Sequence, residues 1–320
     1  MKETLKSVLG ELRIKPVKDL LGELKIGLID IGASGGLEPR WGLIKNNMKA
    51  FMFEPDERSG QKLKSSNYVE AVFPMGLGAA EINSSLNLCR KPQVSSLLSP
   101  RLAFLSRFPD VKRFDIVEKI PIRLSTLDRC LMERSEDCDF IKIDTQGTEL
   151  DILIGGEALL DSSIIGIEVE VEFTRLYEEQ PLFGDICSYL GKKGYEFYAF
   201  VNIGRWEREK FSSFGQTVAA DGLFLRPPEI FAETLSGLPE DIARSKSKKY
   251  IAIVALYDHL DLLPICMNSF NKFLDANDLR LVKRLHAHLL ERRRVSNFIL
   301  WVTNKLFTPF GIHVSACQAE

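Results

Sequence analysis

Between residues 26 and 226, short apolar runs alternate with longer segments whose apolar residues recur at helical spacing. The apolar runs predict strands at 26–31, 50–54, 68–73, 119–124, 139–144 and 164–172. The intervening segments predict helices at 37–48, 56–65, 126–134, 149–160 and 181–193, and a short helix after Ser99-Pro100. Strands that alternate with helices predict βαβ units and therefore a mostly parallel sheet.

The two ends of the chain differ from this central pattern. Residues 3–24 predict amphipathic helices interrupted at Pro16. Residues 195–201 and 217–226 predict a closing antiparallel pair of strands, and after Pro227-Pro228 the pattern is helical throughout. These changes divide the chain into a helical lead-in (1–25), an α/β domain (26–228) and a helical C-terminal extension (229–320).

Composition and charge narrow the class of protein. The chain has 320 residues, of which 45% are hydrophobic and 27% charged, and its net charge is −2, so no overall field attracts nucleic acid. The start is amphipathic and charged, without the apolar core of a signal peptide, and no apolar run is long enough to span a membrane. The six cysteines include no CxxC pair. We therefore expect a cytoplasmic protein without a nucleic-acid partner.

The stretch LIDIGASGG (28–36) places an acid inside an apolar strand, directly before a turn of small residues. Such a turn lets the backbone approach a ligand, but the spacing differs from the G-x-G-x-x-G of dinucleotide sites. Asp30 would repel a pyrophosphate and attract a cationic ligand such as S-adenosylmethionine. Glu54, at the end of the next strand, could accept both ribose hydroxyls of that cofactor. The alternative is a purely structural turn.

Five segments in order carry a family resemblance, namely DIGASGG (30–36), FEPDE (53–57), LSTLDRCL (124–131), FIKIDTQGTELDILIGG (140–156) and IEVEVEF (167–173). Together, over roughly residues 26–226, they resemble the FkbM-like methyltransferases. The resemblance implies a class I fold that depends on S-adenosylmethionine. In that fold, a three-layer Rossmann-like α/β architecture holds a mostly parallel sheet of seven strands, the last one antiparallel.

The resemblance also implies which residues bind the cofactor. The methionine part would be surrounded by Asp30, Gly32, Ala33, Ser34 and Gly35, the ribose would bind Glu54, and the adenine would lie along Gly76, Leu77 and Gly78. The chain departs from the family pattern at two positions. The family commonly has Asn where Ser34 stands and Glu where Gln146 stands, so Gln146 cannot act as an acid.

Acidic residues at the predicted sheet edge are the candidates for catalysis, because residues 1–258 contain no histidine. Asp144 ends a strand at the edge where open α/β sheets bind ligands. Glu168 and Glu170 alternate onto one face of the next strand, together with Glu172. Asp144, Glu168 and Glu170 are therefore the candidate catalytic residues. Asp144 with Glu168 or Glu170 could also hold a divalent metal such as Mg²⁺, which would lower the pKa of a bound hydroxyl. The plainer alternative is that Lys142 neutralises one acid and solvent covers the others.

Three further features have weaker signals. Glu149 fits a first-turn acid favoured by the helix dipole. Ser95-Ser96 and the loop around Tyr177 could line the acceptor site. The segment 283–301 combines a basic run with Phe298–Trp301 and could touch a membrane surface, although such helices more often pack their apolar side on their own domain.

These observations lead to one main hypothesis. We expect an S-adenosylmethionine-dependent O-methyltransferase, and the resemblance supplies its acceptor, a hydroxyl of a sugar, glycan or small natural product. One alternative is a non-catalytic methyltransferase-like module that binds a partner through residues 229–320. The other is an NAD(P)-dependent oxidoreductase, which the missing G-x-G-x-x-G disfavours.

Overall fold

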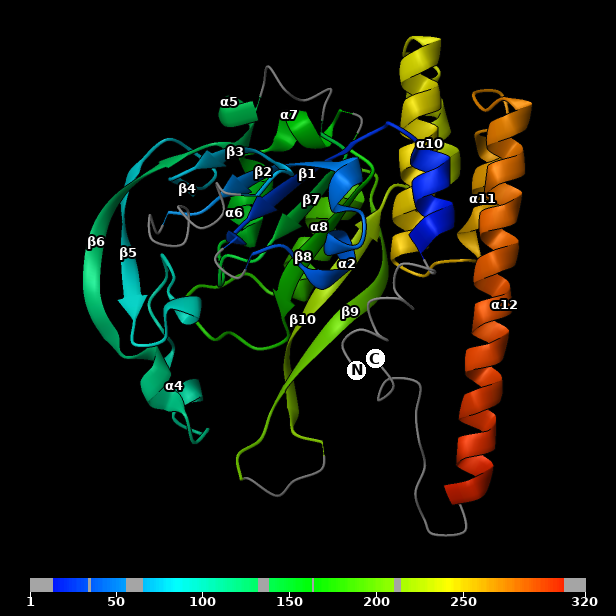
Figure 1. Ribbon diagram of the computed structural model, residues 1–320. Coiled ribbons are helices and arrows are strands. Elements are labelled where there is room, and N and C mark those ends of the chain that lie inside the picture. The colour runs from blue at the N-terminus through cyan, green and yellow to red at the C-terminus, as the bar shows by residue number, and fades with distance from the viewer. Residues whose placement is uncertain are drawn as a thin grey trace.

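The computed structural model describes residues 14–33, 36–55, 66–131, 138–162, 164–209 and 214–307, with side chains as far as residue 294. Its main sheet has seven strands in the order β3-β2-β1-β7-β8-β10-β9 (Figure 1). The strands are β1 (Ile26–Ile31), β2 (Met48–Phe53), β3 (Val69–Phe73), β7 (Phe140–Ile143), β8 (Gly166–Glu172), β9 (Glu196–Trp206) and β10 (Gln216–Leu225). β10 pairs antiparallel with both β8 and β9, whereas the other pairs of neighbouring strands in this sheet are parallel, which confirms the predicted Rossmann-like fold and the closing strand pair.

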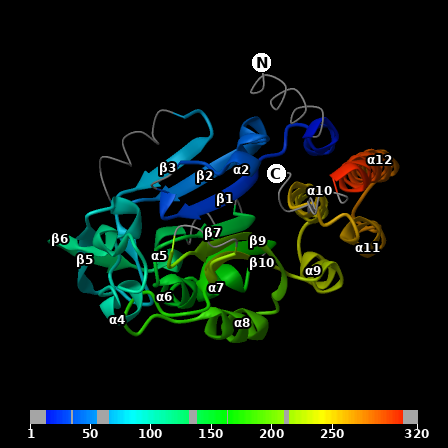
Figure 2. The ribbon, with the colours of Figure 1, turned by 90° about the horizontal axis from the view of Figure 1, so that it is seen from below.

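The central strands are apolar on both sides because the sheet is covered on both faces. Along β1, Leu28 belongs to one hydrophobic core, whereas Ile29 and Ile31 belong to the other. The second of these cores is completed by four short helices, visible on one side of the sheet in Figure 2. They are α5 (Leu127–Leu131), α6 (Glu149–Ile154), α7 (Glu157–Leu160) and α8 (Phe183–Lys192).

The opposite face is covered by helices from both ends of the chain. Its core combines residues of the helix at 14–21 with α2 and the C-terminal helices, so all three predicted segments contribute to it. The helices are α2 (Pro39–Gly42), α9 (Pro228–Leu235), α10 (Glu240–Leu256), α11 (Leu262–Ser269) and α12 (Ala276–Phe307). At the N-terminal end of β7, the buried carboxylate of Asp139 lies 2.7 Å from Lys246 and 2.8 Å from Lys249, which fastens α10 to the sheet.

Two helix predictions were wrong in extent. Instead of a helix over 37–48, the structure has the single turn α2 and a 3₁₀ turn at Lys45–Asn47. Instead of one helix over 149–160, α6 and α7 meet at Gly155, where a Cβ atom would lie 2.1 Å from the carbonyl oxygen of Gly78. The chain bends there because another backbone passes within contact distance.

A second, three-stranded sheet projects from the carboxyl end of the main sheet, on the side opposite α12 (Figure 1). It consists of β4 (Gly76–Leu77), β5 (Asn83–Cys89) and β6 (Ile116–Ser125), in the order β4-β6-β5. The sequence predicted only part of β6. The connection between β5 and β6 contains the short turns η3 (Pro92–Val94), α4 (Leu102–Leu105) and η4 (Val111–Phe114).

The described part of α12 packs an apolar side on the molecule. Val282, Leu285 and Leu289 are buried, whereas Lys283 and Arg284 are exposed. The predicted contact of 283–301 with a membrane surface depends partly on side chains outside the described residues. In the described chain, no helix has the length and apolar character needed to cross a membrane.

Candidate active site

A pocket lies at the carboxyl ends of the parallel strands, where α/β sheets bind their ligands. It is lined by Gly32 after β1, Glu54 after β2, Gly76 and Leu77 of β4, and Asp144 after β7. The structure thus brings five of the predicted site residues together. Asp30 and Ala33 are buried beside this pocket, Gly78 packs against Gly155, and Ser34 and Gly35 lie outside the described residues.

Gly32 has a structural reason to be glycine. Its φ angle is +83°, and a Cβ atom would lie 1.8 Å from the carbonyl oxygen of Asp144. Its N–H donates to the carbonyl of Phe53 over 3.0 Å, and the N–H of Asp144 donates to the carbonyl of Ile31 over 2.9 Å. The ends of β1, β2 and β7 are therefore held within backbone contact at the edge of the pocket, and a side chain at position 32 would prevent this.

Two buried carboxylates lie at this edge. Asp30 is 1% exposed, and in the described part of the chain its Oδ1 has no hydrogen-bond partner. Burial raises the pKa of Asp30 to about 6, and the nearby Lys142 opposes that rise. Glu54 is 5% exposed and lines the pocket directly. An unsatisfied acidic acceptor next to the pocket suits a cationic ligand.

Asp144 and Glu170 are joined by one amide. Gln146 Nε2 donates to Asp144 Oδ1 over 3.0 Å and to Glu170 Oε2 over 2.6 Å. The Tyr177 hydroxyl lies 3.2 Å from Gln146 Oε1 and 2.9 Å from the carbonyl oxygen of Val94, and it can donate to one of them at a time. Gln146 therefore holds two acids at a fixed separation.

The backbone of this bridge is held by its neighbours. Gln146 has a φ angle of 63°, a left-handed conformation that is unfavourable for a residue with a side chain. The Ser96 hydroxyl donates to the Gln146 carbonyl over 2.7 Å. The buried carboxylate of Glu149 accepts the N–H groups of Thr145 and Gly147 over 2.9 Å. Glu149 thus orders this turn through its hydrogen bonds, in addition to the predicted role of an acid in the first turn of a helix.

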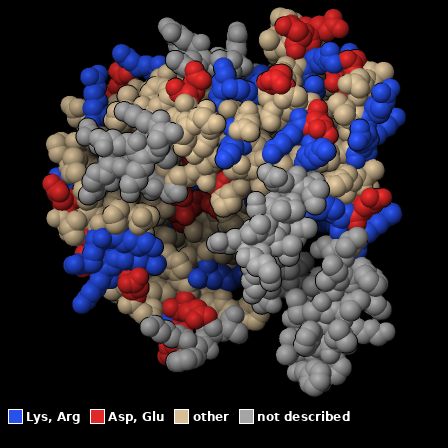
Figure 3. All heavy atoms as spheres, viewed as in Figure 1, with Lys and Arg blue, Asp and Glu red and all other residues tan. Residues whose placement is uncertain are grey.

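The two bridged acids have different surroundings. Burial and the neighbouring Asp144 hold the pKa of Glu170 well above its ordinary value, which favours the protonated form of this acid. The Asp144 side chain is 38% exposed, and its Oδ2 lies 4.0 Å from Lys142 Nζ. Figure 3 shows acidic side chains inside a hollow on this face of the molecule. Asp144 is therefore the acid that can meet a ligand in the pocket.

Glu168 lies on the same face of β8 as Glu170 but has different hydrogen-bond partners. It is 1% exposed, and its Oε2 accepts a hydrogen bond from Arg40 over 3.2 Å and another from the hydroxyl of Tyr257. Burial raises the pKa of Glu168 to about 8. The carboxylate thus binds α2 and the end of α10, and neither partner could be predicted from the sequence.

The predicted Mg²⁺ site gains no support from this arrangement. Glu168 is occupied by Arg40 and Tyr257, and Asp144 by Gln146 and Lys142. In the part of the chain that the structure describes, no group of three or more His, Cys, Asp or Glu side chains is placed to hold a metal. His259 packs against Tyr198 at 5.7 Å between ring centroids, and the described lining of the pocket includes no histidine.

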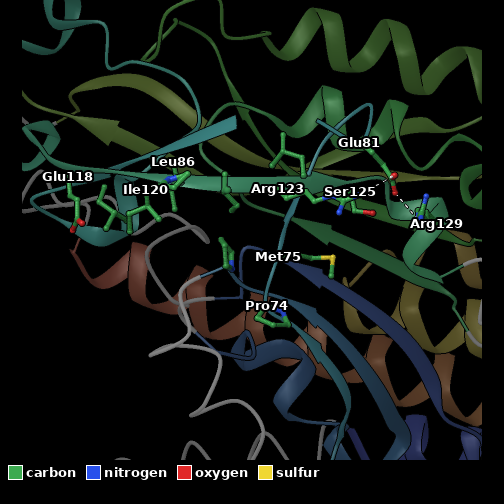
Figure 4. A pocket seen from close by; sticks show the side chains of 14 residues that line it. Pro74, Met75, Glu81, Leu86, Glu118, Ile120, Arg123, Ser125 and Arg129 are labelled. Carbon is green, nitrogen blue, oxygen red and sulfur yellow. Dashed lines mark ion pairs between the residues drawn. The ribbon is translucent and has the colours of Figure 1, made fainter. Parts of the chain in front are cut away.

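A larger groove of about 790 Å³ adjoins the pocket along β6 (Figure 4). The two share Pro55, Met75, Leu86, Leu88 and Ile122, so they form one continuous depression. Figure 4 shows Pro74 and Met75 facing β6 across the groove. At one end Arg129 forms an ion pair with Glu81 over 2.7 Å. An acceptor molecule thus has space next to the pocket.

Comparison with known proteins identifies the family. Residues 30–197, more than half of the chain, match the model of the methyltransferase FkbM domain. The chain therefore belongs to the FkbM methyltransferase family and is a methyltransferase of class I fold, which confirms the predicted resemblance. This membership implies S-adenosylmethionine as the methyl donor, and the pocket with Glu54 in its lining and Asp30 Oδ1 unpaired among the described residues fits that group.

The other comparisons give no information about the substrate. A search of curated proteins found no match. Among solved structures, a precorrin-6y C5,15-methyltransferase from Geobacter metallireducens is 14% identical with a TM-score of 0.30, over 67% of this chain and 87% of that one. Sp1610 of Streptococcus pneumoniae, a putative tRNA (m1A22) methyltransferase, is 12% identical with a TM-score of 0.33, over 86% and 98%. Values this low carry no argument about the acceptor.

Proposed function

We propose that this protein is an S-adenosylmethionine-dependent O-methyltransferase whose acceptor is a hydroxyl of a sugar, glycan or small natural product. The observation that carries the proposal is the pocket in which Gly32, Glu54 and the partly exposed Asp144 meet at one edge of the sheet. The family supplies the methyl donor. The continuous groove beside the pocket supports an acceptor of small-molecule or glycan size rather than a nucleic acid.

The chain's own residues would divide the work of binding. Glu54 would accept hydrogen bonds from the two ribose hydroxyls, and Asp30 would face the cationic part of the cofactor. Gly32, Gly76 and Leu77 would let the backbone approach it closely. S-adenosylmethionine, when bound, supplies a methyl group already activated by its sulfonium, so the protein mainly has to position the acceptor and remove one proton.

Asp144 is the residue placed to take that proton. With the cofactor bound, its sulfonium would supply the activated methyl group, and the Asp144 carboxylate would accept the proton that the acceptor hydroxyl gives up. Gln146 orients this carboxylate from the side, and burial disfavours a second negative charge on Glu170 beside it. The ammonium group of Lys142 lies 4.0 Å from Asp144 Oδ2.

The two rival functions have less support. An oxidoreductase would need a pyrophosphate site, and the turn lacks the required glycine spacing. A non-catalytic module that binds a partner through residues 229–320 would need a free apolar face there. Instead, α9, α10 and α11 bury apolar side chains in the core against the sheet.

The test is methyl transfer from methyl-labelled S-adenosylmethionine to a panel of sugars, oligosaccharides and hydroxylated natural products, with matched amines alongside. The product's methylated atom is assigned by NMR. Labelled O-methyl ethers formed by the wild-type chain and not by Asp144→Asn support the proposal. Methylation of nitrogen alone, or transfer that continues in Asp144→Asn, overturns it.

A further inference from the structure

We propose that Tyr257, at the end of α10, is a positioning residue for the cofactor turn, so that the C-terminal helices complete the cofactor site. This inference rests on the proposed use of S-adenosylmethionine. It assigns a role to the C-terminal segment, for which the sequence alone suggested only a partner or a membrane.

The helix that follows the cofactor turn is too short to be stable without tertiary contacts. α2 has 4 residues, its N-cap residue Glu38 makes no side-chain capping bond, and Trp41 is its one buried residue. A single helical turn is unstable in isolation because its nucleation is unfavourable. The position of α2, and with it the end of the turn that begins at Gly32, must therefore be fixed by tertiary contacts.

Tyr257 supplies these contacts to both central residues of α2. Its ring lies 4.3 Å from the Arg40 guanidinium, and its centroid lies 6.2 Å from that of Trp41, edge to face. Its other contact is with Phe140 of β7, at 5.4 Å between centroids. The ring therefore stands between the sheet and α2.

The Tyr257 hydroxyl closes a charged network under the same turn. It donates to Glu168 Oε2, the oxygen that also accepts from Arg40. Arg40 Nη1 lies 3.5 Å from Glu38 Oε1, so the guanidinium links the segment before α2 to β8. Loss of Tyr257 would leave the buried Glu168 with one donor and Arg40 without its aromatic face.

The two ends of the cofactor turn are thus held by different sets of contacts. The upstream end is fixed by the main sheet, through the bonds of Gly32 and Asp144. The downstream end is held by the sheet, through Trp41 on Phe140 at 5.2 Å between centroids and the bond from Arg40 to Glu168, and in addition by α10 through Tyr257. The described residues of the C-terminal segment accordingly act on the cofactor site from behind it, and none of them lines the pocket.

Tyr250 offers a matched control on the same helix. It is fully buried, and its hydroxyl donates to the carbonyl of Arg226 over 2.6 Å. Its aromatic contacts are with Phe231 and Phe270, away from α2. Tyr250→Leu and Tyr257→Leu therefore remove similar buried volumes from one helix, and only the second touches the turn.

The experiment compares these two variants and Tyr257→Phe by hydrogen exchange of the amides at 36–44 and by calorimetric titration with S-adenosylhomocysteine. We expect Tyr257→Leu to speed exchange in this segment and to weaken the affinity at least about tenfold, with Tyr257→Phe in between. Tyr250→Leu should lower the melting temperature while leaving both readouts within about twofold of wild type.

Equal effects of Tyr250→Leu and Tyr257→Leu on the exchange of 36–44, or no effect of Tyr257→Leu, would overturn the inference. A wild-type chain that binds no S-adenosylhomocysteine would contradict the proposed function instead. The exchange comparison would then still decide whether Tyr257 holds the turn.

Discussion

Gln146 provides the sharpest perturbation of the candidate active site, because one side chain holds both acids. We expect Gln146→Ala to release Asp144 from Glu170 while the surrounding sheet stays intact. Its Nε2 lies 3.0 Å from Asp144 Oδ1 and 2.6 Å from Glu170 Oε2, and both bonds disappear in the variant.

The free energies follow from the partners of each bond. A hydrogen bond to an ionised group contributes about 1.5–3 kcal/mol and one to a neutral group about 0.5–1.5 kcal/mol. Two hydrogen bonds to carboxyl groups are lost together, so Gln146→Ala should lower the free energy of unfolding by about 2–4 kcal/mol. An Asp144 carboxylate without its amide donor should also lower the turnover number at least about tenfold.

Gln146→Gly is the control that separates the backbone from the amide. The φ angle at this position is 63°, a conformation that costs a non-glycine residue about 1–2 kcal/mol. The glycine variant should therefore be more stable than the alanine variant by about 1 kcal/mol. Both variants lack the amide, so both should lose turnover to the same extent.

Stability is measured by urea denaturation, and turnover by S-adenosylhomocysteine release with an acceptor from the hydroxyl panel. A Gln146→Ala enzyme that works at the wild-type rate would refute the role of the bridge. A Gln146→Gly enzyme with restored turnover would show that backbone strain, and not the amide, governs activity.

Three further substitutions test separate parts of the site. Glu54→Ala should weaken the binding of S-adenosylhomocysteine at least about tenfold, and unchanged affinity in calorimetry would remove the ribose assignment. Asp144→Asn should keep its circular dichroism spectrum and lose about 10²-fold or more in initial rate, whereas a near wild-type rate would exclude Asp144 as the base. The third concerns Glu168, whose pKa burial raises from the ordinary 4.5 to about 8 in the folded state. Between pH 5 and 8 the folded state binds more protons than the unfolded state, so the free energy of unfolding falls as pH rises. Denaturation across this range should show a smaller fall in Glu168→Gln, and identical slopes would contradict the burial argument.

The sequence was informative wherever burial imposes a simple pattern. β1, β2 and β7 are covered on both faces, so their residues form mostly apolar runs, whereas β8 alternates apolar residues with buried or half-buried glutamates. The closing pair of strands and the ordered motifs then sufficed for the fold class. The placement of Gly32, Glu54 and Asp144 in one pocket followed from the rule that parallel strands end at a common edge.

The three-stranded sheet has no comparable apolar pattern in its sequence. β5 has the sequence NSSLNLC and is mostly half-buried, so its apolar residues are too few for a strand pattern. β6 is exposed over most of its length. The helix after β1 was predicted too long because apolar spacing continues beyond Gly42, although the backbone there turns instead into a 3₁₀ segment.

The hydrogen-bond partners of the acids also could not be predicted from the sequence. The alternation of Glu168 and Glu170 correctly predicted a shared face, but the two carboxylates have different partners. Tyr257 reaches Glu168 from the far end of α10, and such long-range pairing leaves no local trace. From the sequence, Gln146 was interpreted only as a position where the family's usual acid is missing. In the structure its amide donates hydrogen bonds to two acids, which a third carboxylate at this position would repel.

The most direct test of the cofactor pocket is a calorimetric titration of the purified chain with S-adenosylhomocysteine and, separately, with NAD. The account predicts micromolar binding of the first and none of the second, because Asp30 and Glu54 favour a cationic, phosphate-free ligand over a pyrophosphate. Binding of NAD alone would contradict the assignment of the pocket. If neither ligand binds, the turn after β1 has a structural role only, and a non-catalytic module becomes the favoured interpretation.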